Sequence, residues 1–269
     1  MTANPLILAI DTSSALGGVG LSRGDTSIAA IELGPAGSQA ETILVVMDAL
    51  LQDAGLRPGD LEMVAVALGP GSFAGLRIGL AAAQGIGFAR GIPVVGVPTT
   101  TIRMAWARLV SESIGSAWVA VLDARRGDVF VATGRSARKD PVDIEVLWGP
   151  ELLPASEFAL RVAPMRRAAT LQAPVVFCGE GIPVVAAGLI ESGSSGPGGA
   201  PGDSSPLRSI SPPRPADAVR LLALLARRQF DREGAPAGLE PLYIRPPDAR
   251  KPARSALAPS PPAESNRSS

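Results

Sequence analysis

The chain has 269 residues, 46% of them hydrophobic, which is enough to bury the core of one large domain or of two smaller ones. Its 25 basic and 25 acidic side chains cancel, so no overall field steers the chain toward nucleic acid. Because it has no histidine and only one cysteine, Cys178, the chain excludes a histidine-based nucleophilic mechanism, a histidine or thiolate metal site and an internal disulfide.

The first predicted strand is an apolar run from residue 6 that ends in Asp11, Thr12 and Ser13. Two short strands, Gly18–Arg23 and Thr26–Leu33, are predicted to follow it. A carboxylate beside two hydroxyls could coordinate Mg²⁺ and phosphates. Alternatively, these side chains cap local backbone groups at the end of a strand.

Residues 38–54 are predicted to form a helix. Ser38 and Glu41 have the spacing of a capping box, and Gly55 is a natural residue to end the helix. Apolar side chains cover more than one stripe of this helix: Ile43, Leu44, Val45, Val46, Met47, Ala49, Leu50, Leu51 and Ala54. A helix that packs on one sheet needs only one apolar stripe, so the surplus predicts a second contact.

A glycine loop, residues 69–79, follows the predicted buried strand Met63–Leu68 and leads into a helix that ends near Arg90. A strand, a glycine loop and a helix together can present backbone N–H groups to an anion. No lysine follows the glycines, since the chain has only Lys139 and Lys251, so a P-loop is excluded. The G-x-G-x-x-G spacing of a dinucleotide site is also missing.

Small residues recur every four positions along this second helix. Because glycine inside a helix costs about 1 kcal/mol relative to alanine, the strip implies that another backbone comes close. That backbone belongs either to the chain's own sheet or to a partner. The partner interpretation predicts half of a four-helix bundle. The residues predicted for its interface are Ile43, Val46, Met47, Leu50, Gly75, Gly79, Ala83 and Gly87.

The second half of the chain begins near residue 98. Helices are predicted at 99–112 and 155–162, and strands at 118–123, 128–133, 144–148 and 173–178. Asp123 could belong to a second phosphate loop, but Arg125 and Arg126 stand where close backbone approach requires small residues. Residues 192–215 are rich in Gly, Ser and Pro and predict a flexible linker, and residues 216–230 predict a helix.

Several segments together resemble the TsaB (YeaZ) family, which contains the non-catalytic bacterial partners of the TsaD enzyme. The resemblance runs from near residue 6 to near residue 249 and rests on residues 10–13, 69–79, 84–85, 96–100, 123–130 and 241–245. It implies an α/β, actin-like (ASKHA) fold of two ribonuclease-H-like lobes, whose mixed sheets are flanked by helices. The implied layout is a first lobe at 1–97, a second lobe at 98–191, a linker at 192–215, a helix and Pro-x-Tyr segment packed on the lobes at 216–245, and a disordered tail at 246–269.

The same resemblance implies a function. The chain would pair with a TsaD-like enzyme and activate it to place threonylcarbamoyl on the tRNA adenosine beside the anticodon, and a TsaE-like ATPase would join the complex. Any contact with tRNA would be indirect, and the chain alone could form a homodimer. No catalytic residue, cofactor or metal is expected, and the loop candidates are then vestigial: Asp11, Thr12, Ser13, Gly71, Ser72 and Asp123.

The chain departs from the family pattern at a few positions. Gln39-Ala40 replaces a usual His-Ser, Ala74 replaces a usual Thr, and Val45 stands where Pro is common. TsaD enzymes carry a metal-binding histidine pair in the region of Gln39, so this chain is not expected to hold that metal.

Two other functions stay open. The first is an active ATP-binding phosphotransferase or ATPase of the actin-like superfamily. The second is a peptidase, which no nucleophile–base pair in the sequence supports. A cytoplasmic location without membrane contact is expected, because the sequence contains no long apolar run and no basic segment before its first apolar run.

Overall fold

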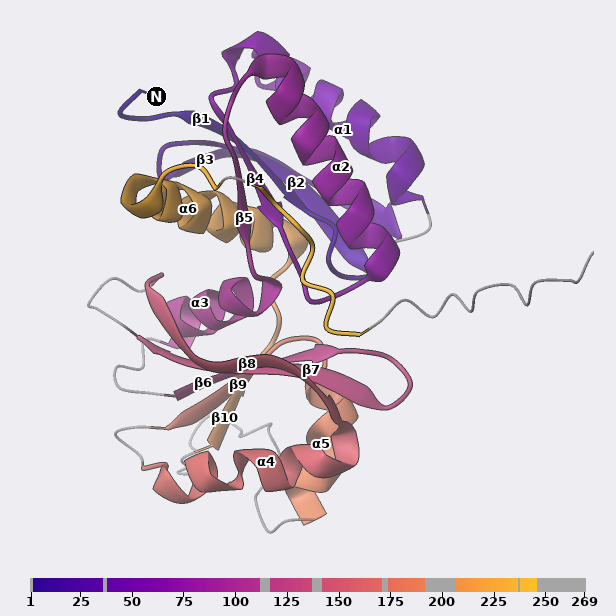
Figure 1. The fold of residues 1–269 in the computed structure, drawn as a ribbon, viewed down its shortest axis with the longest axis vertical. Helices are drawn as coiled ribbons and strands as arrows, with labels where there is room; N and C mark the ends of the chain where they lie inside the picture. Colours follow the sequence, from indigo (N-terminus) through magenta and orange to yellow (C-terminus); the bar gives the residue numbers. More distant parts are fainter. Residues whose placement is uncertain are drawn as a thin grey trace, which may run out of the picture.

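The computed structural model describes residues 2–35, 38–111, 117–136, 142–170, 174–191, 207–236 and 238–245, which form two lobes stacked end to end (Figure 1). The first lobe is built on a five-stranded sheet in the order β3-β2-β1-β4-β5. Its strands are β1 (Leu6–Asp11), β2 (Leu16–Arg23), β3 (Thr26–Pro35), β4 (Met63–Ala67) and β5 (Val94–Val97). The first three strands pair antiparallel, whereas β4 is parallel to both β1 and β5.

The second lobe repeats this topology. Its strands are β6 (Ala117–Asp123), β7 (Asp128–Ser136), β8 (Ile144–Pro154), β9 (Val175–Cys178) and β10 (Leu207–Ile210). They lie in the order β8-β7-β6-β9-β10, with the same alternation of antiparallel and parallel pairs. Two sheets with one strand order indicate a duplicated ribonuclease-H-like unit, which confirms the predicted α/β, actin-like fold.

Strand β10 corrects the prediction of a linker over residues 192–215. Residues 207–210 pair in parallel with β9, and Ile210 packs beside the fully buried Trp118. The Gly, Ser and Pro content of the segment as a whole obscured the four-residue strand Leu207–Ile210. Residues 192–206 and the tail at 246–269 lie outside the described residues.

Helices cover both faces of each sheet (Figure 1). In the first lobe, α1 (Gln39–Asp53) and α2 (Phe73–Arg90) lie on one face and α6 (Pro215–Glu233) lies on the other. Helix α3 (Thr99–Ser111) packs between α6 and the second sheet, and α4 (Ala155–Ala168) and α5 (Ile182–Glu191) cover the far face of that sheet. A single 3₁₀ turn, Pro58–Asp60, precedes β4.

Strand β1 shows why the first lobe folds in these layers. Its side chains point alternately to opposite faces, so Ile7 and Ala9 contact the α6 side and Leu6, Leu8 and Ile10 contact the α1 and α2 side. All five are completely buried. A central strand covered on both faces therefore has a continuous apolar sequence rather than an alternating one.

The ends of α1 and α2 position the loops of the site. Ser38 is the N-cap residue of α1, but its side chain makes no capping hydrogen bond, so the predicted capping box is wrong. Gly55 follows α1 with a φ of +68°, as a helix-ending glycine should. Helix α2 begins at Phe73, earlier than predicted, because the Ser72 hydroxyl caps it by accepting a hydrogen bond from the Gly75 N–H at 3.2 Å.

Within the described part of the chain, none of the helices combines the length and the apolar character that crossing a membrane requires.

Candidate functional site

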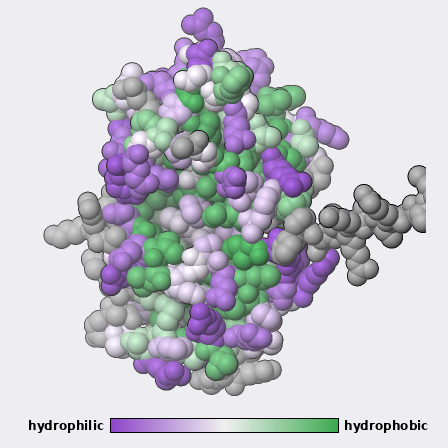
Figure 2. Space-filling view, viewed as in Figure 1, coloured by the Kyte–Doolittle hydropathy of each residue, from purple (hydrophilic) through white to green (hydrophobic). Residues whose placement is uncertain are grey.

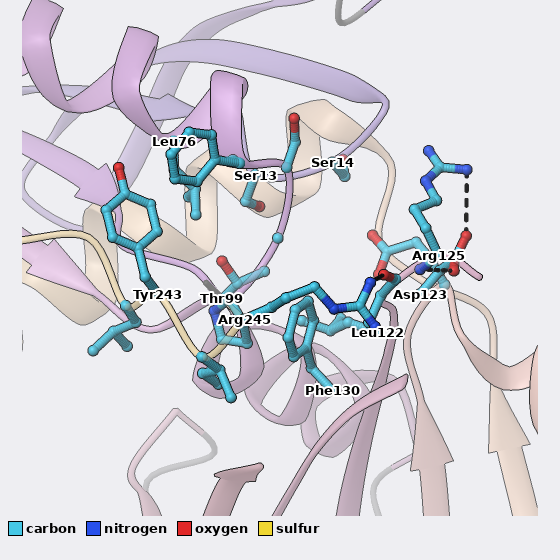
Figure 3. A pocket seen from close by; sticks show the side chains of 18 of the residues that line it. Ser13, Ser14, Leu76, Thr99, Leu122, Asp123, Arg125, Phe130, Tyr243 and Arg245 are labelled. Carbon is cyan, nitrogen blue, oxygen red and sulfur yellow. Dashed lines mark hydrogen bonds and ion pairs between the residues drawn. The ribbon is translucent and has the colours of Figure 1, made fainter. Parts of the chain in front are cut away.

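A cavity of about 640 Å³ lies between the lobes (Figure 3). Six parts of the chain form its wall: the loop after β1, the glycine loop with the start of α2, the start of α3, the β6–β7 turn with the start of β7, Glu180 after β9 and the chain near residue 243. Of the predicted loop residues, Ser13, Gly71, Ser72 and Asp123 line the cavity. The structure thus brings residues from both lobes together, as a duplicated fold with one site between its halves requires.

Asp11, the first candidate for binding a cation, is buried in an ion-pair network. Its Oδ1 accepts hydrogen bonds from the N–H and the hydroxyl of Ser13 at 2.9 and 2.5 Å. Its Oδ2 lies 3.6 Å from Nη1 of Arg103, a residue of α3 that is only 2% exposed. The guanidinium therefore supplies the positive charge that a metal ion would otherwise bring to this carboxylate.

Arg103 also joins Asp11 to the second lobe. Its Nη2 and Nε donate hydrogen bonds to Oε1 of Glu180 at 2.7 and 3.0 Å. Burial alone would lower the pKa of Arg103, but the charges of Glu180 and Asp11 raise its pKa above the ordinary value. The guanidinium stays charged, and a divalent cation placed beside it would be repelled.

The other hydroxyl of the first loop serves the fold. The Thr12 hydroxyl donates a hydrogen bond to the Gly75 carbonyl oxygen at 2.7 Å, and Thr12 is completely buried. A Cβ at Gly75 would overlap the Thr12 carbonyl oxygen, and a Cβ at Gly79 would overlap the Thr12 hydroxyl. Thr12 therefore bonds to nearby backbone, as the second of the two alternatives in the sequence analysis proposed.

The strip of small residues on α2 consequently faces the chain's own sheet, and the prediction that it faces a partner is wrong. Gly75 and Gly79 contact β1, Ala83 is fully buried, and a Cβ at Gly87 would overlap Val94. On α1, the residues predicted for the interface lie in the same core: Ile43, Met47 and Leu50 are at most 3% exposed and Val46 is partly buried. Close approach was correctly inferred, but the approaching backbone is internal.

The outward side of the two helices carries a different set of apolar residues. Leu44 and Val45 of α1 are 61% and 70% exposed, and Phe88 of α2 is 93% exposed. Together with the exposed Ala81, these residues define what we call the α1–α2 outer face. The face of the molecule that Figure 2 shows mixes apolar and polar side chains. The sequence analysis missed Phe88, although its position at the side of the helix away from the small residues marks it as outward.

In the second lobe, the Asp123 carboxylate bonds to Arg125 in the turn between β6 and β7. Its Oδ1 accepts a hydrogen bond from the Arg125 N–H at 2.7 Å, and its Oδ2 lies 3.4 Å from the Arg125 guanidinium. Arg125 and Arg126 have φ values of +64° and +58°, in the left-handed region that favours glycine. Two long side chains thus occupy the turn that would have to approach a phosphate closely.

A segment that sequence analysis did not place in the site crosses the cavity. Residues 239–245, called here the C-terminal strap, run from the first lobe to the second (Figure 3). The Leu242 N–H donates to the Leu68 carbonyl at 2.8 Å in the first lobe. Arg245 donates to the Ala124 carbonyl at 2.7 Å and pairs with Asp128 in the second lobe. No local pattern in the sequence signals such a distant contact.

The charges of the cleft are therefore matched internally. Asp11 and Glu180 share Arg103, Asp123 pairs with Arg125, and Asp128 pairs with Arg245. Among the residues that the structure describes, no three His, Cys, Asp or Glu side chains lie together as a metal site. Cys178 lies behind Arg103 in the core, where burial raises the pKa of its thiol above the ordinary value. This arrangement suits joining two lobes better than holding a magnesium nucleotide.

Comparisons with known proteins agree with the fold. The family model of TsaD, described as tRNA N6-adenosine threonylcarbamoyltransferase, matches residues 36–188, more than half of the chain. The tRNA threonylcarbamoyladenosine biosynthesis protein TsaB of Escherichia coli (strain K12) is 35% identical over 128 residues, which cover 47% of this chain and 53% of that protein. Its counterpart from Haemophilus influenzae is 32% identical over 127 residues, which cover 47% and 52%. The chain thus spans about half the length of the curated relatives it matches.

Two solved structures match more of the chain. YeaZ from Pseudomonas aeruginosa is 21% identical, with a TM-score of 0.63, and the match covers 86% of this chain and 94% of that one. A protein described as similar to peptidase YeaZ from Pseudomonas aeruginosa is 22% identical, with a TM-score of 0.64 and coverage of 90% and 100%. At these identities the structures show a shared fold alone. From the family model, the chain belongs to the TsaD family, and over about half of its length it is similar to the TsaB proteins.

Proposed function

We propose that this chain is a non-catalytic subunit that binds a TsaD-like enzyme and activates it in the threonylcarbamoylation of the tRNA adenosine beside the anticodon. A TsaE-like ATPase joins the complex, contact with tRNA is indirect, and the complex works in the cytoplasm with its tRNA. The curated relatives, which are named for threonylcarbamoyladenosine biosynthesis, support the pathway. The matched charges of the cleft support the absence of catalysis.

The observation that carries the non-catalytic role is the Asp11–Arg103 contact. An enzyme that transfers phosphate needs a carboxylate free to hold the magnesium ion, and it needs room for the phosphates beside it. In this chain a buried guanidinium lies 3.6 Å from that carboxylate and is also held by Glu180. An active ATP-dependent enzyme of the same fold would have to break this network at every turnover.

We further propose that the enzyme docks on the α1–α2 outer face. The inward sides of both helices are used by the first sheet, which leaves Leu44, Val45 and Phe88 as exposed apolar groups on neighbouring helices. Exposed apolar groups that lie together typically mark an interaction surface. Two such helices supply half of a four-helix contact, and a second copy of this chain could occupy the same face when the enzyme is absent.

Charged substitutions on this face test the proposal. Val45→Asp and Phe88→Asp should each weaken binding to the TsaD-like protein of the same organism by about 100-fold or more, because a carboxylate would be buried in an apolar contact. The free energy of unfolding should change by less than about 0.5 kcal/mol, since both side chains are exposed. Calorimetric titration and urea denaturation of the same samples measure the two quantities.

Leu160→Asp is the matched control. Leu160 is an apolar residue of α4 in the other lobe and is 80% exposed, so its replacement should leave binding unchanged. If Val45→Asp and Phe88→Asp bind the enzyme as tightly as the Leu160→Asp control, the enzyme docks elsewhere.

A further inference from the structure

The first turn of α2 and the C-terminal strap share an aromatic and cationic cluster. The Arg77 guanidinium carbon lies 4.1 Å from the centre of the Phe73 ring and 5.7 Å from the centre of the Tyr243 ring. Nε of Arg77 donates a hydrogen bond to the Tyr243 hydroxyl at 3.0 Å, and the two rings contact each other with centres 4.9 Å apart. We call these three residues the Arg77 stack.

The strap fixes the position of Tyr243 in this stack. On one side, the Gln84 side chain of α2 donates to the Leu239 carbonyl at 3.1 Å, and Leu242 is bonded to Leu68. On the other side, Arg245 is bonded to Ala124. Tyr243 is thus held between two anchored residues, and its ring and hydroxyl in turn restrict the rotation of Arg77.

Arg77 differs from the arginines of the cleft because no carboxylate of the described residues pairs with it. Arg103, Arg125 and Arg245 each have an acidic partner, whereas the Arg77 guanidinium contacts the two rings and the Tyr243 hydroxyl. Its side chain is exposed. A guanidinium that is oriented in advance and lacks a carboxylate loses little conformational entropy when it binds one.

The position of Arg77 indicates what it would bind. Ala74, Arg77, Ala81 and Phe88 are spaced by three, four and seven residues, so they share the outward side of α2. On this side of α2, Arg77 is accompanied by exposed apolar residues and not by the row of cations that binds a phosphate backbone. A fixed single cation among apolar residues favours a protein surface that carries a carboxylate.

We propose that Arg77, positioned by Tyr243, pairs with a carboxylate of the protein that docks on the α1–α2 outer face. The C-terminal strap is then part of the docking surface. This inference rests on the proposed function, because the docking protein is the TsaD-like enzyme. Arg77 makes the contact, whereas Tyr243 acts through Arg77 as a positioning residue.

The test measures the dissociation constant for the TsaD-like protein by calorimetry at about 50 mM and 300 mM NaCl. Arg77→Met keeps an unbranched apolar side chain and removes the charge, so it should weaken binding about 10- to 100-fold at low salt. The dissociation constant of Arg77→Met should also change less between the two salt concentrations, because one ion pair is lost. Arg90→Met removes an exposed arginine of the same helix, which donates to the Gly59 carbonyl, and should change the constant by less than about twofold.

Variants of Tyr243 separate positioning from general stability. Tyr243→Phe keeps the ring and removes the hydroxyl acceptor, so it should weaken binding only about two- to fivefold. Tyr243→Ala should weaken binding more and flatten the salt dependence as Arg77→Met does, and the double variant should be no weaker than Arg77→Met alone. A merely structural role for Tyr243 would lower the melting temperature and leave the salt dependence as in the wild type, which would overturn its positioning role.

The failures of the two proposals are distinguishable. If wild type binds the enzyme and Arg77→Met binds equally tightly, the inference about Arg77 is wrong and the proposed function stands. If Arg77→Met still binds the enzyme but no longer binds a tRNA probe, Arg77 contacts RNA and not the enzyme, and the inference is also wrong. If the wild-type chain does not bind the enzyme, the proposed function itself fails.

Discussion

Arg103 is the side chain that most restricts what the cleft can do. It is 2% exposed and it contacts a carboxylate from each lobe, Asp11 of β1 and Glu180 after β9. Arg103 and Asp11 are buried and Glu180 is partly buried, and the cost of taking these charges out of water is offset only while they remain together. The network therefore links the two lobes across the cleft, and it engages the Asp11 carboxylate that could otherwise coordinate a cation.

Replacing Arg103 by Met should lower the free energy of unfolding by about 3–5 kcal/mol, because it leaves two carboxylates without their buried partner. Arg57→Ala is the control. The Arg57 side chain is 86% exposed in its pair with Asp60, so its loss should cost less than about 1 kcal/mol. Urea denaturation followed by circular dichroism measures both. Wild-type stability of Arg103→Met would show that the network does not hold the lobes.

At the scale of the element, α2 carries glycines of two kinds. Gly75, Gly79 and Gly87 have no room for a Cβ, because β1 and β5 side chains or backbone lie against them. Gly85 is exposed, and a Cβ there would meet nothing within 4 Å. The first kind lets the helix approach the sheet closely, whereas Gly85 only weakens the helix.

Alanine substitutions in α2 should therefore have opposite effects. Gly85→Ala should stabilise the protein by about 0.5–1 kcal/mol through helix propensity and a less flexible unfolded chain. Gly75→Ala should destabilise it by about 1–3 kcal/mol, because overlap with the Thr12 carbonyl outweighs the same gain. Melting temperatures of the two variants decide the matter. If Gly75→Ala were as stable as Gly85→Ala, α2 would not pack closely against the chain at the end of β1.

The same helix shows what could be predicted from sequence and what could not. Most of the buried strands and helices follow from apolar periodicity, although β5, β10 and α5 were not predicted. The small-residue strip correctly indicated close approach. A periodic pattern does not identify the approaching group, however, so the strip was assigned to a partner instead of β1. Likewise, Asp11 and Arg103 are far apart in the sequence, and Tyr243 is farther still from Arg77. Such contacts arise from tertiary packing, which no local pattern encodes.

At the scale of the molecule, several connections join the lobes, and three of them lie at or near the cleft. The Arg103 network crosses the cleft, α3 packs against α6, and the C-terminal strap bonds to Leu68 on one side and Ala124 on the other. The cleft is thus bridged by internal contacts, and Leu44, Val45 and Phe88, which are exposed apolar residues of α1 and α2, do not line it. Under the proposed function, the contacts in the cleft join the lobes, and the α1–α2 outer face binds the enzyme.

The central claim is that the enzyme needs this chain's outer face and does not need its cleft as a catalytic site. The most direct measurement is threonylcarbamoyladenosine formed per tRNA in a reaction reconstituted with the TsaD-like enzyme and the TsaE-like ATPase, quantified by mass spectrometry of digested tRNA. Three proteins are compared: wild type, Phe88→Asp on the outer face and Asp123→Asn in the cleft. The account predicts that Phe88→Asp lowers the product at least about tenfold and that Asp123→Asn stays within about twofold of wild type. Loss of product with Asp123→Asn while the complex still forms, or full product with Phe88→Asp, would contradict it.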